Sequence, residues 1–245
     1  MSRFFIHAED IEGNILTIRE DVHHILHVLR YKEGDQIEVC DRQGMDYIVK
    51  IVETNEDFIK CEILNEEKSS AEPEIEITLF QGMPKSDKME WILQKGVELG
   101  ISRFIPLWTH RCVVKYDQKK ESGKISRWQK IVESAAKQSG RGSIPIVHNS
   151  VSLKECMQQV SDYDMVLLFY ENAREQSLKA FLDRQETMPH RVAILIGPEG
   201  GWEPEEVAKL EDAGAITAGL GPRILRTETA GMTAATLILY HFDQI

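Results

Sequence analysis

After residue 75, short apolar runs that resemble strands alternate with longer runs that have helical periodicity. The strand-like runs are Ile75–Phe80, Phe104–Leu107, Met165–Tyr170, Val192–Ile196 and Ile216–Leu220. The helix-like runs lie near Met89–Leu99, Ile125–Ser139, Leu153–Val160, Ser177–Leu182, Glu205–Ala213 and Ala230–Phe242. This alternation predicts an α/β domain with a mostly parallel sheet and helices on both faces. The last helix is apolar on several sides, which predicts deep burial or a subunit interface.

The first part of the chain has a different pattern, with short strands separated by polar turns. The expected strands are Phe4–Ile6, Asn14–Ile18, Gln36–Cys40, Tyr47–Val52 and Phe58–Leu64. A helix from Val22 to Leu29, capped by Asp21, interrupts them, and the short strands together predict a small barrel. Asn65–Glu74 has almost no apolar residue and is expected to be a linker. We therefore expect a β-rich domain over residues 1–70 and an α/β domain over residues 75–245.

The net charge of −11 argues against indiscriminate binding of nucleic acid, which needs many cations. The basic residues are nevertheless concentrated between Arg111 and Arg141, where only Asp117, Glu121 and Glu133 oppose them. They are Arg111, Lys115, Lys119, Lys120, Lys124, Arg127, Lys130, Lys137 and Arg141. Such a run is typical either of a docking face for one specific RNA or of an ordinary solvated helix face.

Cysteine and histidine spacing gives no sign of a metal site. Cys40, Cys61, Cys112 and Cys156 are scattered, which indicates free thiols in a reducing cytoplasm. His23 and His27 are four residues apart on the expected helix, without a third ligand at a zinc-site spacing. No apolar run has membrane-spanning length and no secretory signal is evident, so we expect a cytoplasmic protein without a metal or a membrane contact.

Two glycine-proline loops follow the last two strand-like runs. They read Ile196-Gly-Pro-Glu-Gly-Gly201 and Leu220-Gly-Pro-Arg-Ile-Leu-Arg-Thr-Glu-Thr-Ala230. Loops at the ends of neighbouring strands form a cleft, and glycine lets a ligand approach the main chain closely. Neither common phosphate-binding motif is present, and Glu199 would repel a pyrophosphate. An uncharged adenosine or a cationic ligand is therefore favoured, although ordinary strand-to-helix turns have the same composition.

These loops resemble the C-terminal motifs of the RsmE family, and the similarity extends over nearly the whole chain. Further matching segments are Phe80-Gln-Gly-Met-Pro-Lys-Ser-Asp-Lys88, Lys95-Gly-Val-Glu-Leu-Gly-Ile101, Ala135-Ala-Lys-Gln-Ser-Gly-Arg141, Arg3-Phe4 and His24-Ile-Leu-His-Val-Leu-Arg30. The family belongs to the SPOUT class and methylates N3 of a uridine in 16S ribosomal RNA during ribosome biogenesis. The resemblance implies a PUA-like RNA-binding barrel, then a methyltransferase domain with a C-terminal trefoil knot, and a homodimer. Nothing in the periodicity indicates the knot.

The resemblance also implies a cofactor, S-adenosylmethionine, bound by both loops and by the end of the strand-like run Met165–Tyr170. The expected cofactor-binding residues are Leu168, Phe169, Tyr170, Glu171, Ile196, Gly197, Pro198, Glu199, Gly200, Gly201, Leu220, Gly221, Arg223, Ile224, Leu225 and Thr227. Apolar side chains would hold the adenine, and backbone groups would fix its orientation.

Uridine N3 carries a proton at neutral pH, so methylation needs a base or a cation that stabilises the uridine anion. We assign the cation to Arg226 and assign to Glu228 either proton removal or the orientation of Arg226. A salt bridge that caps a helix is the structural alternative for this pair. The expected partner is 16S RNA within the small ribosomal subunit, and the residues expected to contact it are Arg3, His24, Arg30, Lys85, Arg111, Lys124, Arg127 and Arg141.

Two other classes of function stay open at this point. A Rossmann-type enzyme would use Glu171 as the ribose-binding acid after its strand, but the glycine-rich first turn of that fold is missing. A non-catalytic RNA-binding module would use only the barrel. The sequence pattern alone fixes neither the modified nucleotide nor the choice between free RNA and an assembled subunit as substrate.

Overall fold

The computed structural model describes residues 3–85, 87–113, 118–173 and 176–245. The chain divides into two compact units, and each is described by itself. Unit 1 comprises residues 1–72 and 136–144, and unit 2 comprises residues 73–135 and 145–245. Within the described residues, no helix is long and apolar enough to cross a membrane, and no cluster of potential metal ligands is found.

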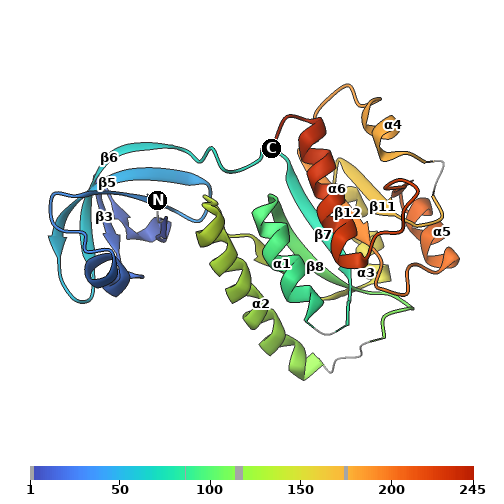
Figure 1. Ribbon diagram of the computed structural model, residues 1–245, viewed down its shortest axis with the longest axis horizontal. Coiled ribbons are helices and arrows are strands. Elements are labelled where there is room, and N and C mark those ends of the chain that lie inside the picture. The colour runs from blue at the N-terminus through green and yellow to red at the C-terminus, as the bar shows by residue number, and fades with distance from the viewer. Residues whose placement is uncertain (1–2, 86, 114–117, 174–175) are drawn as a thin grey trace. The chain divides into compact units, whose positions relative to one another are not determined.

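Unit 1 is built on a curled six-stranded sheet (Figure 1). Its strands are β1 (Phe4–Phe5), β2 (Ile11–Glu12), β3 (Ile15–Ile18), β4 (Gln36–Cys40), β5 (Met45–Thr54) and β6 (Ile59–Lys68), in the order β1-β4-β5-β6-β3-β2. The β1–β4 pair is parallel and the others are antiparallel. Alternating residues such as Leu16, Val39 and Ile59 bury their side chains in one core, as the period of two predicted.

Two expectations for unit 1 were wrong. The turn after Asp21 is a π-helix, η2 (His24–Val28), in which Leu29 N–H bonds to His24 O, five residues back. Asp21 has a positive φ of 59° and makes no cap, because its carboxylate pairs with Lys137. The expected linker is shorter, because residues 65–68 continue β6 against residues 45–48 of β5. Main-chain hydrogen bonds hold this strand end without apolar side chains.

Unit 2 contains a seven-stranded, entirely parallel sheet. Its strands are β7 (Glu76–Gly82), β8 (Ile101–Trp108), β9 (Ile146–Val147), β10 (Val151–Ser152), β11 (Met165–Phe169), β12 (Arg191–Ile196) and β13 (Ile216–Ala218). The order is β10-β8-β7-β12-β11-β13, with β9 also paired to β8. The five expected strands of this region are all present, whereas the two-residue strands β9 and β10 were too short to show a period.

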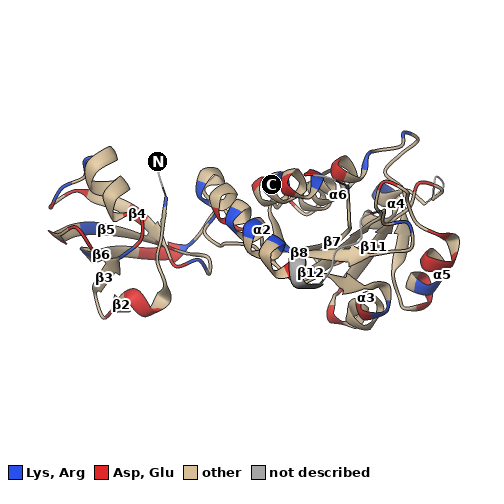
Figure 2. Cartoon of the chain, turned by 90° about the horizontal axis from the view of Figure 1, so that it is seen from below, with Lys and Arg blue, Asp and Glu red and all other residues tan. Residues whose placement is uncertain are grey.

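Helices cover both faces of this sheet, as predicted (Figures 1 and 2). On one face, α1 (Lys88–Glu98) and α6 (Thr227–His241) pack together, and α6 lies on β7 and β12. On the other face, α3 (Leu153–Gln159) and α5 (Pro204–Asp212) pack together. The remaining helices are α2 (Gln118–Ser139) and α4 (Leu178–Leu182), with 3-10 turns at Ala8–Asp10 and Val160–Asp162. The carboxyl ends of the central strands stay uncovered by these layers, and the site forms there.

Candidate functional site

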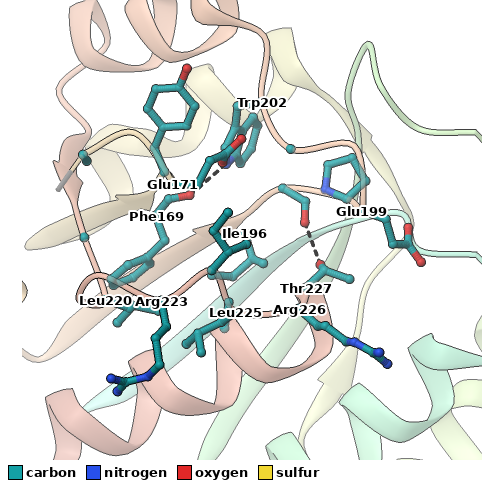
Figure 3. A pocket seen from close by; sticks show the side chains of 18 of the residues that line it. Phe169, Glu171, Ile196, Glu199, Trp202, Leu220, Arg223, Leu225, Arg226 and Thr227 are labelled. Carbon is teal, nitrogen blue, oxygen red and sulfur yellow. Dashed lines mark hydrogen bonds between the residues drawn. The ribbon is translucent and has the colours of Figure 1, made fainter.

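Three loops at the carboxyl ends of β11, β12 and β13 enclose a cavity of about 450 Å³. Because β12 and β11 are adjacent, and β11 also pairs with β13, the three strand ends meet at one edge of the sheet. Figure 3 shows Phe169, Ile196, Leu220 and Leu225 around this space. The volume is that of a small-molecule site, and the walls combine apolar side chains with loop main chain.

The structure brings together 15 of the 16 residues predicted to bind the cofactor; all except Leu168 line this cavity. Leu168 is fully buried in β11, and its side chain packs into the core behind the site. Alternation along the strand explains the difference from Phe169, because this next residue points to the opposite face and lines the cavity. The cavity is therefore formed by the predicted loops.

Close main-chain packing shapes the first loop. A Cβ at Gly82 would lie 2.4 Å from Pro198 N, so the end of β7 can approach this loop only as glycine. Gly201 has a φ of +70°, and a Cβ there would lie 2.6 Å from Glu171 Oε1. The loop is thus held against both β7 and the loop that follows β11.

Side-chain hydrogen bonds fix the same loop from two directions. Thr227 Oγ1, in the first turn of α6, donates to Gly197 O at 2.6 Å and accepts from Gln81 Nε2 at 2.8 Å. Trp202 Nε1 donates to Phe169 O at 3.0 Å, which links the first loop to the end of β11 (Figure 3). These buried bonds pre-order the cavity, because breaking them would leave main-chain carbonyls unpaired.

Charged groups lie at one end of the cavity. Lys88 Nζ lies 3.2 Å from Glu199 Oε1 and 3.1 Å from Glu228 Oε2. Desolvation by itself would lower the pKa of Lys88, but its hydrogen bonds to Glu228 and Glu199 outweigh this and raise that pKa. The pKa of Glu199 is lowered: burial opposes the change, and backbone N–H groups, including that of Lys85, together with Lys88 favour the carboxylate.

The two residues assigned to catalysis have different surroundings. Arg226 lines the cavity, and its side chain is 83% exposed. Glu228 is mostly buried, and its carboxylate is closer to Lys88 than to Arg226, from which it lies 3.9 Å away. Arg226 occupies the N-cap position of α6 and makes no side-chain cap bond, and its ion pair with Glu228, in the first turn of this helix, is long at 3.9 Å.

The eight residues predicted to contact RNA differ in burial, and Arg3 and Arg141 are not at the surface. Arg3 is mostly buried in unit 1 beside Glu38 and Asp46, and Arg141 is buried in an ion pair with Glu72. Desolvation opposes the ionisation of Glu72, but hydrogen bonds from Arg141 and Ser143 lower its pKa. Both arginines thus have structural partners that occupy their guanidinium groups.

The other predicted contacts lie at the surface of their own units. Arg111 braces the first loop, since it donates to Gly200 O and to both oxygens of Glu203. The hydrogen bond that Glu203 accepts from Arg111 is the main reason why the pKa of Glu203 is lowered. Four side chains are exposed: His24, Arg30, Lys85 and Arg127. Arg127 pairs with Glu90, and Lys124 is half-buried on the same helix, α2.

Basic residues recur along α2 (Figure 2). The described ones include Lys124, Arg127, Lys130 and Lys137, while Trp128 points into the core as expected. Lys115 and Asp117, and the side chains of Lys119 and Lys120, lie outside the described residues. The described residues thus keep an exposed basic face on this helix.

Sequence reasoning missed several residues that line the cavity. They are Lys88, Ala173, Trp202, Ala218, Gly219, Pro222 and Ala230. Lys88 and Trp202 had a detectable signal, because Lys88 ends one of the family-like segments and Trp202 directly follows the first loop. Gly219 had no such signal, because its closeness to Ala173 arises only from the fold. A Cβ at Gly219 would lie 2.4 Å from Ala173 O.

The family of this chain follows from its similarity to known proteins. The model of the RNA methyltransferase domain family matches residues 71–239, and that of the RNA methyltransferase PUA domain family matches residues 18–64. The ribosomal RNA small subunit methyltransferase E of Bacillus subtilis (strain 168) is 40% identical over 250 residues, which cover 99% of this chain and 98% of the relative.

Solved structures agree with this similarity in both sequence and fold. A ribosomal RNA small subunit methyltransferase E from Neisseria gonorrhoeae, bound to S-adenosyl methionine, is 30% identical with a TM-score of 0.81; the match covers 98% of this chain and 97% of that one. A methyltransferase from Legionella pneumophila in complex with the same cofactor is 30% identical with a TM-score of 0.80 and the same coverage. The family-like motifs, the α/β domain with its PUA-like N-terminal region and these matches agree, and the chain belongs to the ribosomal RNA small subunit methyltransferase E (RsmE) family.

Proposed function

We propose that the protein methylates N3 of one uridine in 16S ribosomal RNA, with S-adenosylmethionine as the methyl donor. The observation that carries this proposal is the cavity between three loops, which Arg226 lines, with the Glu228 carboxylate 3.9 Å from the Arg226 guanidinium. Family membership supports the reaction class, and the bound cofactor of the related structures supports the choice of donor.

The residues of the cavity fit this cofactor by their chemistry. Phe169, Ile196, Leu220 and Leu225 offer apolar walls for an adenine, and the glycine-proline loops offer main-chain donors and acceptors. Glu171 and Glu199 add negative charge that favours a sulfonium and disfavours a pyrophosphate. The 16 residues predicted from the sequence thus stay the proposed cofactor set, with Leu168 acting from the core behind them.

Two groups of this chain would act on the uridine. Arg226 would stabilise negative charge on a uracil carbonyl oxygen, since its guanidinium is exposed and lies beside the cavity. Glu228 would accept the N3 proton or orient Arg226. When bound, the cofactor supplies a methyl group, whose bond to sulfur breaks with its electron pair left on sulfur as the bond to N3 forms. Much of the rate would come from positioning.

We place the RNA contacts on surface cations and give the buried arginines a structural role. His24, Arg30, Lys85, Lys124 and Arg127 remain the proposed contacts, with Arg111 indirect through the loop that it braces. Arg3 and Arg141 would support the PUA-like unit from within. A local basic face on an acidic protein suits one docked RNA, here 16S RNA within the small ribosomal subunit.

Assembly, threading and location complete the proposal. Leu237 and Tyr240 on α6 are exposed, Tyr240 to 71%, which supports a homodimer through this helix. Helix α6 follows the edge strand β13 yet packs on β7 and β12, as a C-terminal segment that threads a trefoil knot would. Free cysteines and a ribosomal substrate support a cytoplasmic location. Residues 1–70 would form the PUA-like domain and 75–245 the methyltransferase domain.

The two alternatives have weaker support. A Rossmann-type enzyme needs a glycine-rich turn after its first strand, which is absent, and its ribose-binding acid would be Glu171. A purely RNA-binding module would have no use for a pre-ordered cavity of this size. A thermal-shift comparison of NAD with S-adenosylmethionine separates the first alternative from the proposal.

The decisive experiment incubates the protein with labelled S-adenosylmethionine and small ribosomal subunits that lack the modification. We expect one uridine of 16S RNA to acquire label at N3, mapped by mass spectrometry of nuclease digests. Free 16S RNA in parallel identifies the substrate form. Cofactor binding without methylation of either substrate would overturn the proposal, as would tighter binding of NAD than of S-adenosylmethionine.

A further inference from the structure

A second, smaller cavity lies beside the cofactor cavity, between the first turns of α1 and α6. Its volume is about 270 Å³, and it is lined by Lys88, Trp91, Arg226, Glu228 and Thr229. Lys88 and Arg226 line the larger cavity as well, so the two spaces share a wall. Methyl transfer requires the acceptor atom to lie next to the donor, which makes an adjoining space the natural place for the acceptor.

Its charged side chains are fixed before any ligand arrives. Lys88 Nζ holds the Glu228 carboxylate at 3.1 Å and the Glu199 carboxylate at 3.2 Å. Glu199 is also held by the backbone N–H of Lys85. Through Lys88, the Glu228 carboxylate of the smaller cavity is therefore linked to Glu199 in the first loop of the larger cavity. Neither carboxylate has to reorganise when a ligand binds.

Trp91 gives this cavity an aromatic wall. The residue is 46% exposed on the outer side of α1, whereas its neighbours Met89, Ile92 and Leu93 are buried. An exposed indole beside hydrogen-bonding groups suits a ligand that is flat and polar at its edge. Single-stranded bases bind proteins in this way, by stacking on aromatic side chains while their edges are read by polar groups.

The polar groups of the cavity match the edge of a uracil. Uracil offers two carbonyl acceptors and one N–H donor, and N3 lies between the carbonyls. Arg226 and the hydroxyl group of Thr229 can donate to carbonyl oxygens, and the Glu228 carboxylate can accept from an N–H group. A phosphate would meet the negative charge of Glu228.

We propose that the smaller cavity is the subsite for the target uracil base, which is turned out of the RNA and stacks on Trp91. This inference rests on the proposed function and adds to it where the base lies and which side chain holds its face. Trp91 binds the base and takes no part in proton transfer. Turning the base out leaves its N3 directed toward the shared wall.

The test compares Trp91→Ala, Trp91→Phe and a matched control, Gln94→Ala, which alters an exposed residue one turn further along α1. Each variant is assayed for kcat and KM with unmodified small ribosomal subunits and for equilibrium binding to them. Cofactor affinity is measured by calorimetry, and oligomeric state by sedimentation. We expect Trp91→Ala to lower kcat/KM roughly ten- to a hundredfold, the range expected when one base–aromatic stack is removed.

Trp91→Phe should keep most of the activity, and Gln94→Ala all of it, while cofactor affinity and sedimentation stay unchanged in every variant. Unaltered kcat/KM in Trp91→Ala would overturn the inference. A shift of Trp91→Ala toward monomers would also overturn it, because Trp91 would then cover a second copy of the chain. If the wild-type protein itself transfers no methyl group to RNA, the proposed function fails instead, so the two failures are distinguishable.

Discussion

Arginines in the two units show opposite ways of using one side chain. In unit 1, Arg141 is 3% exposed, and its guanidinium makes a two-point ion pair with Glu72, which also accepts from Gly142 N and Ser143 N. In unit 2, Arg226 is almost fully exposed, and its nearest carboxylate lies 3.9 Å away. Burial with saturated partners makes a cation structural, whereas exposure beside a cavity leaves it ready for a ligand.

The largest expected effect is on the buried pair. Glu72→Ala should lower the free energy of unfolding of unit 1 by about 3–5 kcal/mol, because the buried guanidinium of Arg141 loses the carboxylate that neutralises it. Hydrogen exchange of the β4, β5 and β6 amides follows this unit separately. As a control, Glu53→Ala breaks the exposed pair with Lys60 and should cost less than about 1 kcal/mol. Equal destabilisation of the two variants would mean that burial does not distinguish these pairs.

The same pair sets a pH dependence. The pKa of Glu72 is lowered from its ordinary value of 4.5, so its contribution to stability is complete above that pH. The contribution is lost as the pH falls through the lower, folded-state pKa. We therefore expect the stability difference between wild type and Glu72→Gln to be largest near neutral pH and to shrink in acid, as measured by urea unfolding at pH 7 and pH 4. A difference that grows in acid would contradict this assignment.

Arg226 should show the reverse pattern, a loss of activity without a loss of stability. Arg226→Ala should reduce the rate of methyl transfer about 10²–10³-fold, the usual effect of deleting one donor to developing negative charge. The thermal unfolding midpoint and the cofactor affinity should stay near wild type, because the side chain packs against little. Arg226→Lys restores the charge and should recover part of the rate. Unimpaired methylation in Arg226→Ala would remove this residue from the chemistry.

Thr227 tests whether the cavity is pre-ordered by buried hydrogen bonds. Thr227→Val keeps the shape but leaves Gly197 O and the Gln81 amide without this partner. We expect a loss of about 1–3 kcal/mol in unfolding free energy, together with weaker cofactor binding by calorimetry. Thr233→Val, which removes one bond within α6 to Thr229 O, is the matched control and should change cofactor binding little. Unchanged cofactor binding in Thr227→Val would mean that the first loop keeps its structure without the hydrogen bonds of Thr227.

A small effect on stability is expected on the basic face of α2. Charge reversal at Lys124 and Arg127 should change the unfolding free energy by about 1 kcal/mol or less, the range of an exposed ion pair such as that of Arg127 with Glu90. The same change should reduce the salt dependence of RNA binding by roughly 0.7–0.9 in the log–log slope for each phosphate that the protein no longer neutralises. Lys179→Glu on α4 changes an exposed charge outside this face and serves as the control. An unchanged slope would move the RNA-binding surface elsewhere.

Most elements of the fold were predictable, because their patterns are local. The apolar runs that became β7, β8, β11 and β12 are largely buried on both faces, as a parallel sheet requires, whereas the edge strand β13 exposes Ile216. The π-helix after Asp21 was not predictable, since a four-residue spacing does not distinguish a wider turn from an α-helix. The end of β6 was missed because main-chain pairing with β5, and no side-chain pattern, keeps residues 65–68 in the strand.

By itself, the sequence determined the two glycine-proline loops and the ligand chemistry that they favour, since the glycine, proline and acidic residues of these loops act locally. Only the tertiary structure decided which cations have carboxylate partners. Arg141 and Arg226 look alike in the sequence, but Glu72 lies 69 residues from Arg141 along the chain. The tertiary structure likewise placed Lys88 beside Glu228, 140 residues away, and so brought the two cavities together at Lys88. Charge pairing acts through space, and spacing along a chain carries no record of it.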